Sequence, residues 1–229
     1  MNFFEQIVQQ TEQQRAGFVK APLIEQCFRG EVKLDDYVAF LAEAYHHVKH
    51  TVPLLMAVGS RLPESKEWLR TAVAEYIEEE MGHQEWILND IAACGYDKEL
   101  VRAGSPSLAT ELMVSYAYDQ VQRKNPVGFF GMVYVLEGTS INLADQAASV
   151  IQQQLGLPGS AFTYLRSHGA IDQEHVKFFE ILMNQIVDED DQKSILHCAN
   201  VFFELYGNIF RTLGSNPDLV PAATAGKFA

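Results

Sequence analysis

The chain has 229 residues, of which 48% are hydrophobic, and this is enough apolar material for one sizeable core in a single domain. Seventeen lysines and arginines stand against thirty aspartates and glutamates, which gives a formal net charge of -13. Because such a charge repels nucleic acid and anionic lipid, we expect neither nucleic acid nor a membrane among the partners.

The beginning of the chain and its cysteines indicate where the protein works. The stretch "MNFFEQIVQQTEQQR" lacks the basic segment and the long apolar segment of a signal peptide. No apolar run approaches the roughly eighteen residues that a membrane span needs. Cys27, Cys94 and Cys198 are far apart and form no CxxC motif. We therefore expect a reduced, cytoplasmic protein.

Helical spacing dominates the first part of the chain, where apolar residues recur at three- and four-residue steps. This spacing predicts an amphipathic helix over residues 2–28, interrupted near Pro22. A second helix is expected to start after an Asp35 cap. Pro53 should kink or break this second helix, because proline has no backbone N–H to donate.

The middle of the chain predicts two further helices and a connection. Residues 63–94 are expected to form a third helix, which Gly95 closes. Residues 96–107, "YDKELVRAGSPS", combine charged residues with glycine and proline and are expected to be a connection. A fourth helix follows over residues 108–124 and ends before Pro126.

The last part of the chain contains the most apolar helix. Residues 127–155 predict a long helix that is apolar all round, so we expect it at the centre of the molecule. Two more helices follow over residues 160–187 and 189–213. The sequence therefore predicts an all-α, single-domain bundle of about seven helices over residues 1–215, with a C-terminal tail over residues 216–229.

A short polar stretch, "HGAIDQEH", places His168, Asp172 and His175 within eight residues. On a helix, where each residue turns about 100°, these three side chains share one stripe about 60° wide. Such a stripe fits either a solvated polar face or half of a metal site. One carboxylate-x-x-histidine match does not decide between the two interpretations, because short matches occur by chance.

The same carboxylate-x-x-histidine spacing occurs in "AEYIEEEMGHQEW", where it is formed by Glu80 and His83. Glu79 lies within about 40° of His83 on a continuous helix and is the alternative carboxylate. The structural alternative to a metal ligand is a solvated acidic helix face, to which the three consecutive glutamates contribute.

Glu137 is a third candidate, because ten uncharged residues precede it in an apolar helix. A buried carboxylate is costly unless it is paired, protonated or bound to a metal ion. Gly138 beside it would let a neighbouring helix or a ligand approach closely. The alternative to a metal ligand is a buried glutamate bonded to a tyrosine such as Tyr134 or Tyr164.

These residues together follow the ligand pattern of carboxylate-bridged di-iron helical bundles, in which side chains from several helices converge on two metal ions. Hard carboxylates hold iron, imidazoles complete the coordination shell, and manganese would suit the same ligands nearly as well. The predicted metal ligands are Glu80, His83, Glu137, His168, Asp172 and His175.

The order of "EEEMGHQEWILND", "YVLEGTS" and "HGAIDQEHVKFF" resembles the heme-oxygenase-like superfamily, and within it the branch of iron-containing oxidases and oxygenases that includes CADD-like proteins. TenA-type thiaminases and PqqC-type quinone synthases share that fold. The resemblance covers residues 5–213 and implies the same six metal ligands. Some members place the first glutamate seven residues before its histidine, where this chain has Tyr76. The interval from Asp172 to His175 is also one residue shorter than in some members.

The resemblance implies a metal-dependent oxidoreductase in which two non-heme iron ions activate O2 on a small organic substrate in a buried pocket. The reactions of such relatives include oxidative decarboxylation, N-oxygenation and C–C cleavage, and the sequence selects none of them. The alternative is a TenA/PqqC-like small-molecule-binding or cofactor-metabolism protein without metal, or a non-catalytic regulatory protein on the same fold. A homodimer would show an apolar, exposed helix face, which the sequence does not locate.

Further candidates lie in "EAYHHVKH", where Glu43, His47 and His50 repeat the spacing of the polar stretch described above. We interpret these residues and His46 as part of a helix surface; the alternatives are a second metal-binding face, or roles around the metal ligands and in a substrate pocket. Heme would need an axial histidine here and would leave the six predicted ligands without a purpose. Thiamine hydrolysis would need a nucleophilic cysteine, whereas Cys94 is expected at a helix C-terminus, where the dipole raises a thiol pKa.

Overall fold

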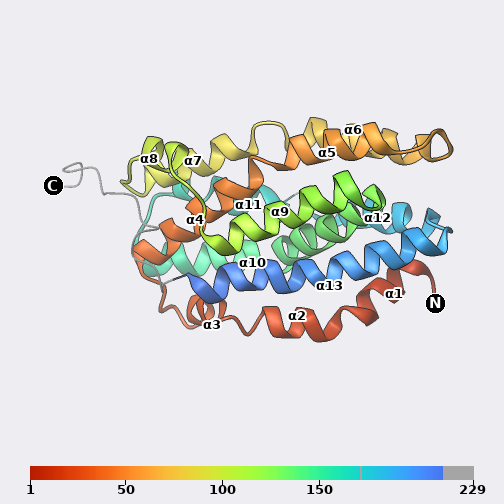
Figure 1. Cartoon of the computed structure of the whole chain (residues 1–229). Helices are drawn as coiled ribbons and strands as arrows, with labels where there is room; N and C mark the ends of the chain where they lie inside the picture. The colour runs from red at the N-terminus through yellow and green to blue at the C-terminus, as the bar shows by residue number, and fades with distance from the viewer. Residues whose placement is uncertain (171, 214–229) are drawn as a thin grey trace.

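The computed structural model describes residues 1–170 and 172–213, with the backbone alone at residues 142, 168–170 and 172–175. Within these ranges the chain forms α-helices and short 3-10 turns and no β-strand, which confirms the predicted all-α fold (Figure 1). The predicted tail over residues 216–229 lies outside the described residues.

The described part of the chain is divided into more and shorter helices than the seven predicted, because several expected long helices are broken. The 3-10 turns are η1 (Glu64–Lys66), η2 (Pro126–Phe129) and η3 (Gly159–Ala161). The α-helices are α1 (Phe3–Gln10), α2 (Glu12–Phe18), α3 (Pro22–Phe28), α4 (Leu34–Val48), α5 (Thr51–Arg61), α6 (Glu67–Glu80), α7 (His83–Ala93), α8 (Lys98–Ala103), α9 (Leu108–Arg123), α10 (Phe130–Leu155), α11 (Thr163–Ala170), α12 (Asp172–Gln185) and α13 (Glu189–Thr212).

The expected helix over residues 2–28 is three helices. α1 and α2 separate at Thr11, whose buried hydroxyl donates to the Ile7 carbonyl at 2.7 Å. A threonine hydroxyl that bonds to the preceding turn competes with continued helix, so it favours a break at this position. α3 then begins at Pro22, since a proline in the first helical turn loses no intrahelical hydrogen bond.

The second predicted helix is broken near Pro53, as expected, and forms α4 and α5. Pro53 lies in the first turn of α5, because it has no N–H to donate to the carbonyl of Lys49. The predicted Asp35 cap is wrong: α4 begins at Leu34, after an extended N-cap at Lys33. Asp35 lies inside the first turn, where its charge is favourable at the positive end of the helix dipole.

The prediction of one helix over residues 63–94 is also wrong. The chain breaks at Gly82, whose φ of +97° belongs to the left-handed region that favours glycine. Glu80 is therefore the last residue of α6, and His83 is the first residue of α7. The expected connection over residues 96–107 contains a short helix, α8, which begins after Asp97 accepts a hydrogen bond from the backbone N–H of Glu99 at 2.9 Å.

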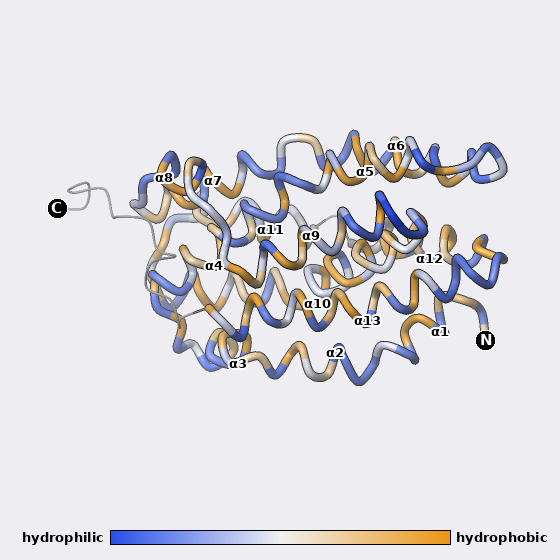
Figure 2. Tube along the Cα trace, in the orientation of Figure 1, coloured by the Kyte–Doolittle hydropathy of each residue, from blue (hydrophilic) through white to orange (hydrophobic). Residues whose placement is uncertain are grey.

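The central position of α10 is confirmed, because α10 packs against both α13 and α11 (Figure 1). Small residues allow the close approach to α13. A Cβ atom added at Gly131 would lie only 2.5 Å from the backbone nitrogen of Ala199 and 2.6 Å from the carbonyl oxygen of Ile195. Hydrophobic and hydrophilic residues follow one another along the helices, as expected for amphipathic elements that share one core (Figure 2).

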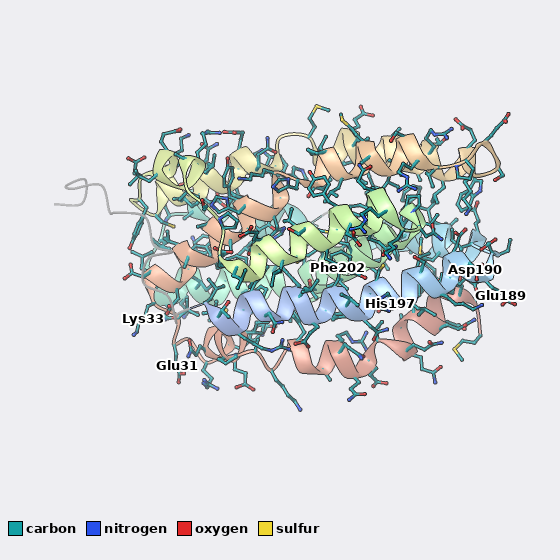
Figure 3. The ribbon with its side chains drawn as sticks, viewed as in Figure 1. Glu31, Lys33, Glu189, Asp190, His197 and Phe202 are labelled. Carbon is teal, nitrogen blue, oxygen red and sulfur yellow. The ribbon has the colours of Figure 1, made fainter. Side chains whose placement is uncertain are left out.

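The end of the bundle agrees in part with the prediction. The expected helix over residues 160–187 is described as α11 and α12, and residue 171 between them lies outside the description. α13 matches the last predicted helix. Its first turn carries Glu189 and Asp190 (Figure 3), whose charges are favourable at a helix N-terminus. The side chain of Asp188 caps it by accepting from the backbone N–H groups of Asp190 and Asp191, both at 3.0 Å.

The described helices differ in length and hydropathy from a typical membrane span. No single one of them is long and apolar enough to cross a membrane. The segments Pro126–Ile141 and Leu143–Leu155, bent by 44° relative to each other, reach that length and composition only as a pair. Because the central helix of a packed core has the same length and composition, and α10 packs against α13 and α11, we interpret this pair as the buried core of the bundle.

Candidate metal centre

Glu137 lies in the N-terminal third of α10 and lines a cavity with about 610 Å³ of empty volume. We call it the acidic cavity, because two glutamates line it and none of its described lining residues is lysine or arginine. Helices α4, α5, α6, α10, α11 and α13 contribute to its wall. Its lining residues are His47, Val48, Thr51, Leu55, Tyr76, Glu80, Phe129, Met132, Val133, Leu136, Glu137, Ser140, Tyr164 and Tyr206.

The electrostatics of this cavity centre on Glu137. Burial raises the pKa of the Glu137 carboxyl well above its ordinary value, and the charges of Glu80 and then Glu79 raise it further. Only an interaction with Tyr76 lowers it. Several carboxylates that share a buried cavity without a described cationic side chain need protons or a metal cation to balance their charge.

Tyr76 lies on α6, seven residues before His83, and lines the acidic cavity. Its buried hydroxyl has no hydrogen-bond partner of good geometry within the described part of the chain, yet it lies close enough to the Glu137 carboxylate to lower the pKa of that carboxyl. The tyrosine beside Glu137 is therefore Tyr76. Of the two tyrosines named in the sequence analysis, Tyr164 also lines the acidic cavity, whereas Tyr134 pairs with the Thr11 hydroxyl at 3.3 Å.

Glu80 and His83 meet although a helix break separates them. The Nδ1 atom of His83 lies 3.0 Å from the Oε2 atom of Glu80, and the two side chains are only 5% and 19% exposed. The imidazole stacks on Trp86, with ring centroids 4.2 Å apart. The sequence spacing predicted contact between Glu80 and His83 on one continuous helix. The left-handed turn at Gly82 brings the two side chains together instead.

The structure distinguishes Glu80 from the alternative carboxylate. Glu80 lines the acidic cavity and contacts His83, whereas Glu79 is an exposed residue. Glu80 also raises the pKa of Glu137 more strongly than Glu79 does. Among the residues near the α6–α7 junction, Glu80 is therefore the better-placed oxygen donor.

The other half of the predicted ligand set lies on α11 and α12. The backbone of His168 belongs to α11, and that of Asp172 and His175 to α12, but these three side chains lie outside the described part of the structure. Both helices pack against α10, which carries Glu137. Within the described side chains, no group of three or more His, Cys, Asp or Glu residues is arranged to hold a metal ion.

The donor groups that are described fit a metal site. Glu80, His83 and Glu137 supply hard oxygen atoms and imidazole nitrogen, which iron and manganese accept. Two of these groups are brought together at the α6–α7 junction, and the third is a buried carboxylate whose ionised form needs a positive partner. The Tyr76 hydroxyl adds a polar atom at the same cavity, and its interaction with Glu137 lowers the pKa of that carboxyl.

The surface interpretation of the histidine-rich stretch on α4 is wrong, because Glu43, His46 and His47 are buried. Glu43 is fully used by α9: its carboxylate accepts from the backbone N–H of Ser107 at 3.0 Å, from the Ser107 hydroxyl at 2.7 Å and from the Thr110 hydroxyl. A carboxylate at this position neutralises the open N–H groups at the start of α9.

The three histidines of α4 and its C-terminal turn have different surroundings. His47 lines the acidic cavity. A role in a pocket was the alternative interpretation of this stretch in the sequence analysis. The Nδ1 atom of His46 lies 3.2 Å from the ammonium of Lys49, and burial together with that charge lowers the pKa of His46 to about 4. His50 pairs with the Tyr118 hydroxyl at 3.1 Å.

The cysteines provide no activated nucleophile. All three are buried. Burial raises the pKa of Cys27 to about 11, and burial together with the charge of Asp90 raises the pKa of Cys94 to about 12. Burial also raises the pKa of Cys198. Because the thiolate is the reactive form, these environments speak against a thiaminase that depends on a cysteine.

Two further cavities adjoin α10. The first, which we call the apolar cavity, has about 720 Å³ of empty volume and is lined by Phe18, Leu23, Ile24, Cys27, Phe28, Val32, Asp36, Tyr37, Phe40, Thr139, Ser140, Leu143, Ala144, Ala147, Ile151, Tyr164, Leu165, Tyr206 and Phe210. The second, the Arg15 cavity, has about 640 Å³ and is lined by Phe4, Val8, Arg15, Tyr134, Glu137, Gly138, Thr139, Ile141, Val176, Phe179 and Phe203. Glu137 therefore lies between the acidic cavity and the Arg15 cavity.

Comparison with solved structures confirms the fold suggested by the sequence motifs. A domain of unknown function with a heme-oxygenase-like fold from Shewanella denitrificans OS217 is 22% identical, with a TM-score of 0.84 over 100% of this chain and 99% of that chain. A TenA homologue from Pseudomonas syringae pv. tomato is 12% identical, with a TM-score of 0.77 over 92% and 91% of the two chains. A CADD-like protein from Nostoc punctiforme is 13% identical, with a TM-score of 0.68 over 94% of each chain.

Comparison of the sequence itself identifies the family. No curated protein matches the chain. Residues 38–207, however, match the family described as "Iron-containing redox enzyme". This range begins in α4 and ends in α13, and it includes all six predicted metal ligands. The chain therefore belongs to the family of iron-containing redox enzymes and has the heme-oxygenase-like fold.

Proposed function

We propose that this protein is a non-heme di-iron oxidoreductase that uses O2 to oxidise a small organic substrate. The observation that carries the proposal is the Glu137 carboxylate, whose pKa is raised by burial and then by the charge of Glu80, which lines the same acidic cavity. The described lining of that cavity contains no lysine or arginine, and Arg15 lines the cavity on the other side of Glu137. A protein cavity of this kind favours a bound metal cation. Membership of a family of iron-containing redox enzymes supports iron as that cation.

The ligands would come from two sides of the cavity. Glu80, His83 and Glu137 would hold metal from the α6–α7 junction and from α10. His168, Asp172 and His175 would complete the set from α11 and α12, which pack against α10. When bound, iron supplies the redox chemistry with O2, and manganese is the metal that the same donors would accept in its place.

The chain itself contributes exclusion of water and control of charge. Apolar side chains such as Leu55, Met132 and Leu136 line the acidic cavity, and they keep its electrostatic interactions strong by limiting access of solvent. The Tyr76 hydroxyl stabilises the ionised form of Glu137, since it lowers the pKa of that carboxyl. His47 offers an imidazole nitrogen at the wall of the same cavity, where a substrate group could be oriented.

The proposal is tested by metal content after anaerobic reconstitution with Fe(II). We expect about two irons per wild-type chain, and loss of iron in Glu137→Gln and His175→Ala. Glu43→Gln is the matched control, because Glu43 is a buried glutamate whose carboxylate serves α9 instead of the acidic cavity. Its iron content should equal that of the wild type.

Absence of iron from every sample, or equal loss in Glu137→Gln and Glu43→Gln, would overturn the di-iron proposal. The first outcome would favour a metal-free small-molecule-binding protein on the TenA/PqqC-like fold. Parallel reconstitution with Mn(II), alone and in competition with Fe(II), measures which of the two metals the donor set prefers.

A further inference from the structure

The apolar cavity is lined mainly by apolar side chains, and aromatic rings form much of its wall. The rings hold one another in place. Tyr206 stacks on Phe18 with centroids 5.3 Å apart and meets Phe210 edge-on at 5.0 Å. Phe40 packs against Phe210 at 5.6 Å. The wall is therefore a preformed aromatic surface.

This cavity adjoins the acidic cavity, which holds the proposed metal centre. Ser140, Tyr164 and Tyr206 line both the apolar cavity and the acidic cavity. Ser140 follows Glu137 by three residues on α10, so the two side chains lie on the same face of that helix. A ligand that spans the two cavities, with one end beside Glu137, would therefore pass Ser140 to reach the apolar cavity.

Charge restricts what the far end of such a molecule carries. Asp36 is the charged residue among the described lining of the apolar cavity, and it does not line the acidic cavity. The negative charge therefore lies away from the wall that the two cavities share. The chain has a net charge of -13, and the described lining contains no cationic side chain. A negative charge on the ligand in this cavity would therefore be repelled by Asp36.

We propose that the apolar cavity binds the ring-containing, apolar body of the substrate, and that the far end of this body carries no negative charge. The polar group that reacts would lie in the acidic cavity. Ring-containing bodies are favoured over alkyl chains because edge-on and offset contacts between aromatic rings add to the burial of apolar area. This inference rests on the proposed function for the placing of the reacting group, but the binding site itself does not require metal.

Binding to chelator-treated protein tests the inference, with calorimetry as the readout. Three probes separate the alternatives: 2-naphthylmethanol, the flexible alkyl alcohol decanol, and 6-hydroxymethyl-2-naphthoate, which adds a carboxylate at the far end. Ala147→Phe fills the apolar cavity, and Val8→Phe makes a comparable change in the Arg15 cavity. Asp36→Asn removes the charge and keeps a side-chain oxygen for the Lys33 backbone N–H.

We expect 2-naphthylmethanol to bind the wild type, to bind Ala147→Phe at least about tenfold more weakly, and to bind Val8→Phe unchanged. The naphthoate should bind the wild type at least about tenfold more weakly than 2-naphthylmethanol, and Asp36→Asn should remove most of this difference. These two results are independent. If Ala147→Phe folds poorly, the comparison of the naphthoate with 2-naphthylmethanol on the wild type and Asp36→Asn still tests the inference.

Three results would overturn the inference: naphthylmethanol binding that Ala147→Phe does not weaken, decanol binding as tight as that of naphthylmethanol, or equal binding of the naphthoate to the wild type. Because no iron is present, failure here is distinguishable from failure of the di-iron proposal. Iron binding without probe binding would support the di-iron oxidoreductase proposal and exclude substrates with a ring-containing apolar body. Probe binding without iron binding would leave the cavity as the ligand site of a metal-free protein.

Discussion

The substitution Glu137→Gln should change how the stability of the metal-free protein depends on pH. Burial raises the pKa of Glu137 from its ordinary value of 4.5, so the folded protein holds a proton that the unfolded chain releases above that pH. The free energy of unfolding then falls as pH rises from about 4.5 towards the folded pKa, with a limiting slope of about 1.4 kcal/mol per pH unit for one proton. Glutamine does not titrate, and this loss should be absent from the variant.

The assay is urea unfolding of chelator-treated wild type and Glu137→Gln from pH 5 to pH 8. We expect the free energy of unfolding of the variant, relative to that of the wild type, to increase by up to about 1.4 kcal/mol for each pH unit. Asp90, whose pKa burial also raises, titrates in both proteins and cancels in the difference. Glu43→Gln is the control for loss of a buried carboxylate elsewhere. A difference between wild type and Glu137→Gln that stays constant over this range would refute the reasoning.

Three further outcomes follow from the same geometry. Tyr76→Phe should raise the pKa of Glu137 and lower the stability of the metal-free protein by about 1 kcal/mol at alkaline pH, as measured by the same unfolding series. Gly82→Ala should cost about 1 kcal/mol or more in thermal unfolding, and it should lower iron content, because φ there is +97° and the turn brings Glu80 to His83. The native thiols should react with a thiol reagent at pH 8 only as fast as the protein unfolds, because all three are buried and the pKa of Cys27 is raised to about 11.

The sequence predicted the fold class because helical periodicity is a local signal that runs through most of the chain. It failed at the helix breaks, which depend on single residues. Gly82 lies in a stretch whose neighbours all favour a helix, and only its positive φ shows that the chain turns there. α8 was missed because six residues are too few to show a period. A short helix of this kind is stabilised by its Asp97 cap and by packing against α7.

The sequence predicted those members of the candidate site whose residue type is unusual for their position. Glu137 stands out as the one carboxylate in an apolar stretch, and an acid in such a stretch is a candidate for a functional site. Tyr76 and His47 were not identified as neighbours of Glu137, because tyrosine and histidine at helical spacing are compatible with an ordinary core. Their roles depend on how α4 and α6 pack against α10, and a single sequence does not encode that contact in any local pattern.

The effect of Glu137→Gln should change sign when metal is bound, and this distinguishes a metal centre from a polar pocket. In the metal-free protein at pH 8, removal of the carboxylate relieves the cost of ionising a buried acid, so the variant should be more stable. In the presence of iron, the ionised carboxylate is a ligand, and binding stabilises the folded wild type by about 1.4 kcal/mol for each tenfold excess of free iron over the dissociation constant. The iron concentration is chosen so that this stabilisation exceeds the advantage that the variant has without iron. The variant should then be the less stable protein. A Glu137 that served only to pair with Tyr76 would show the same sign with and without iron.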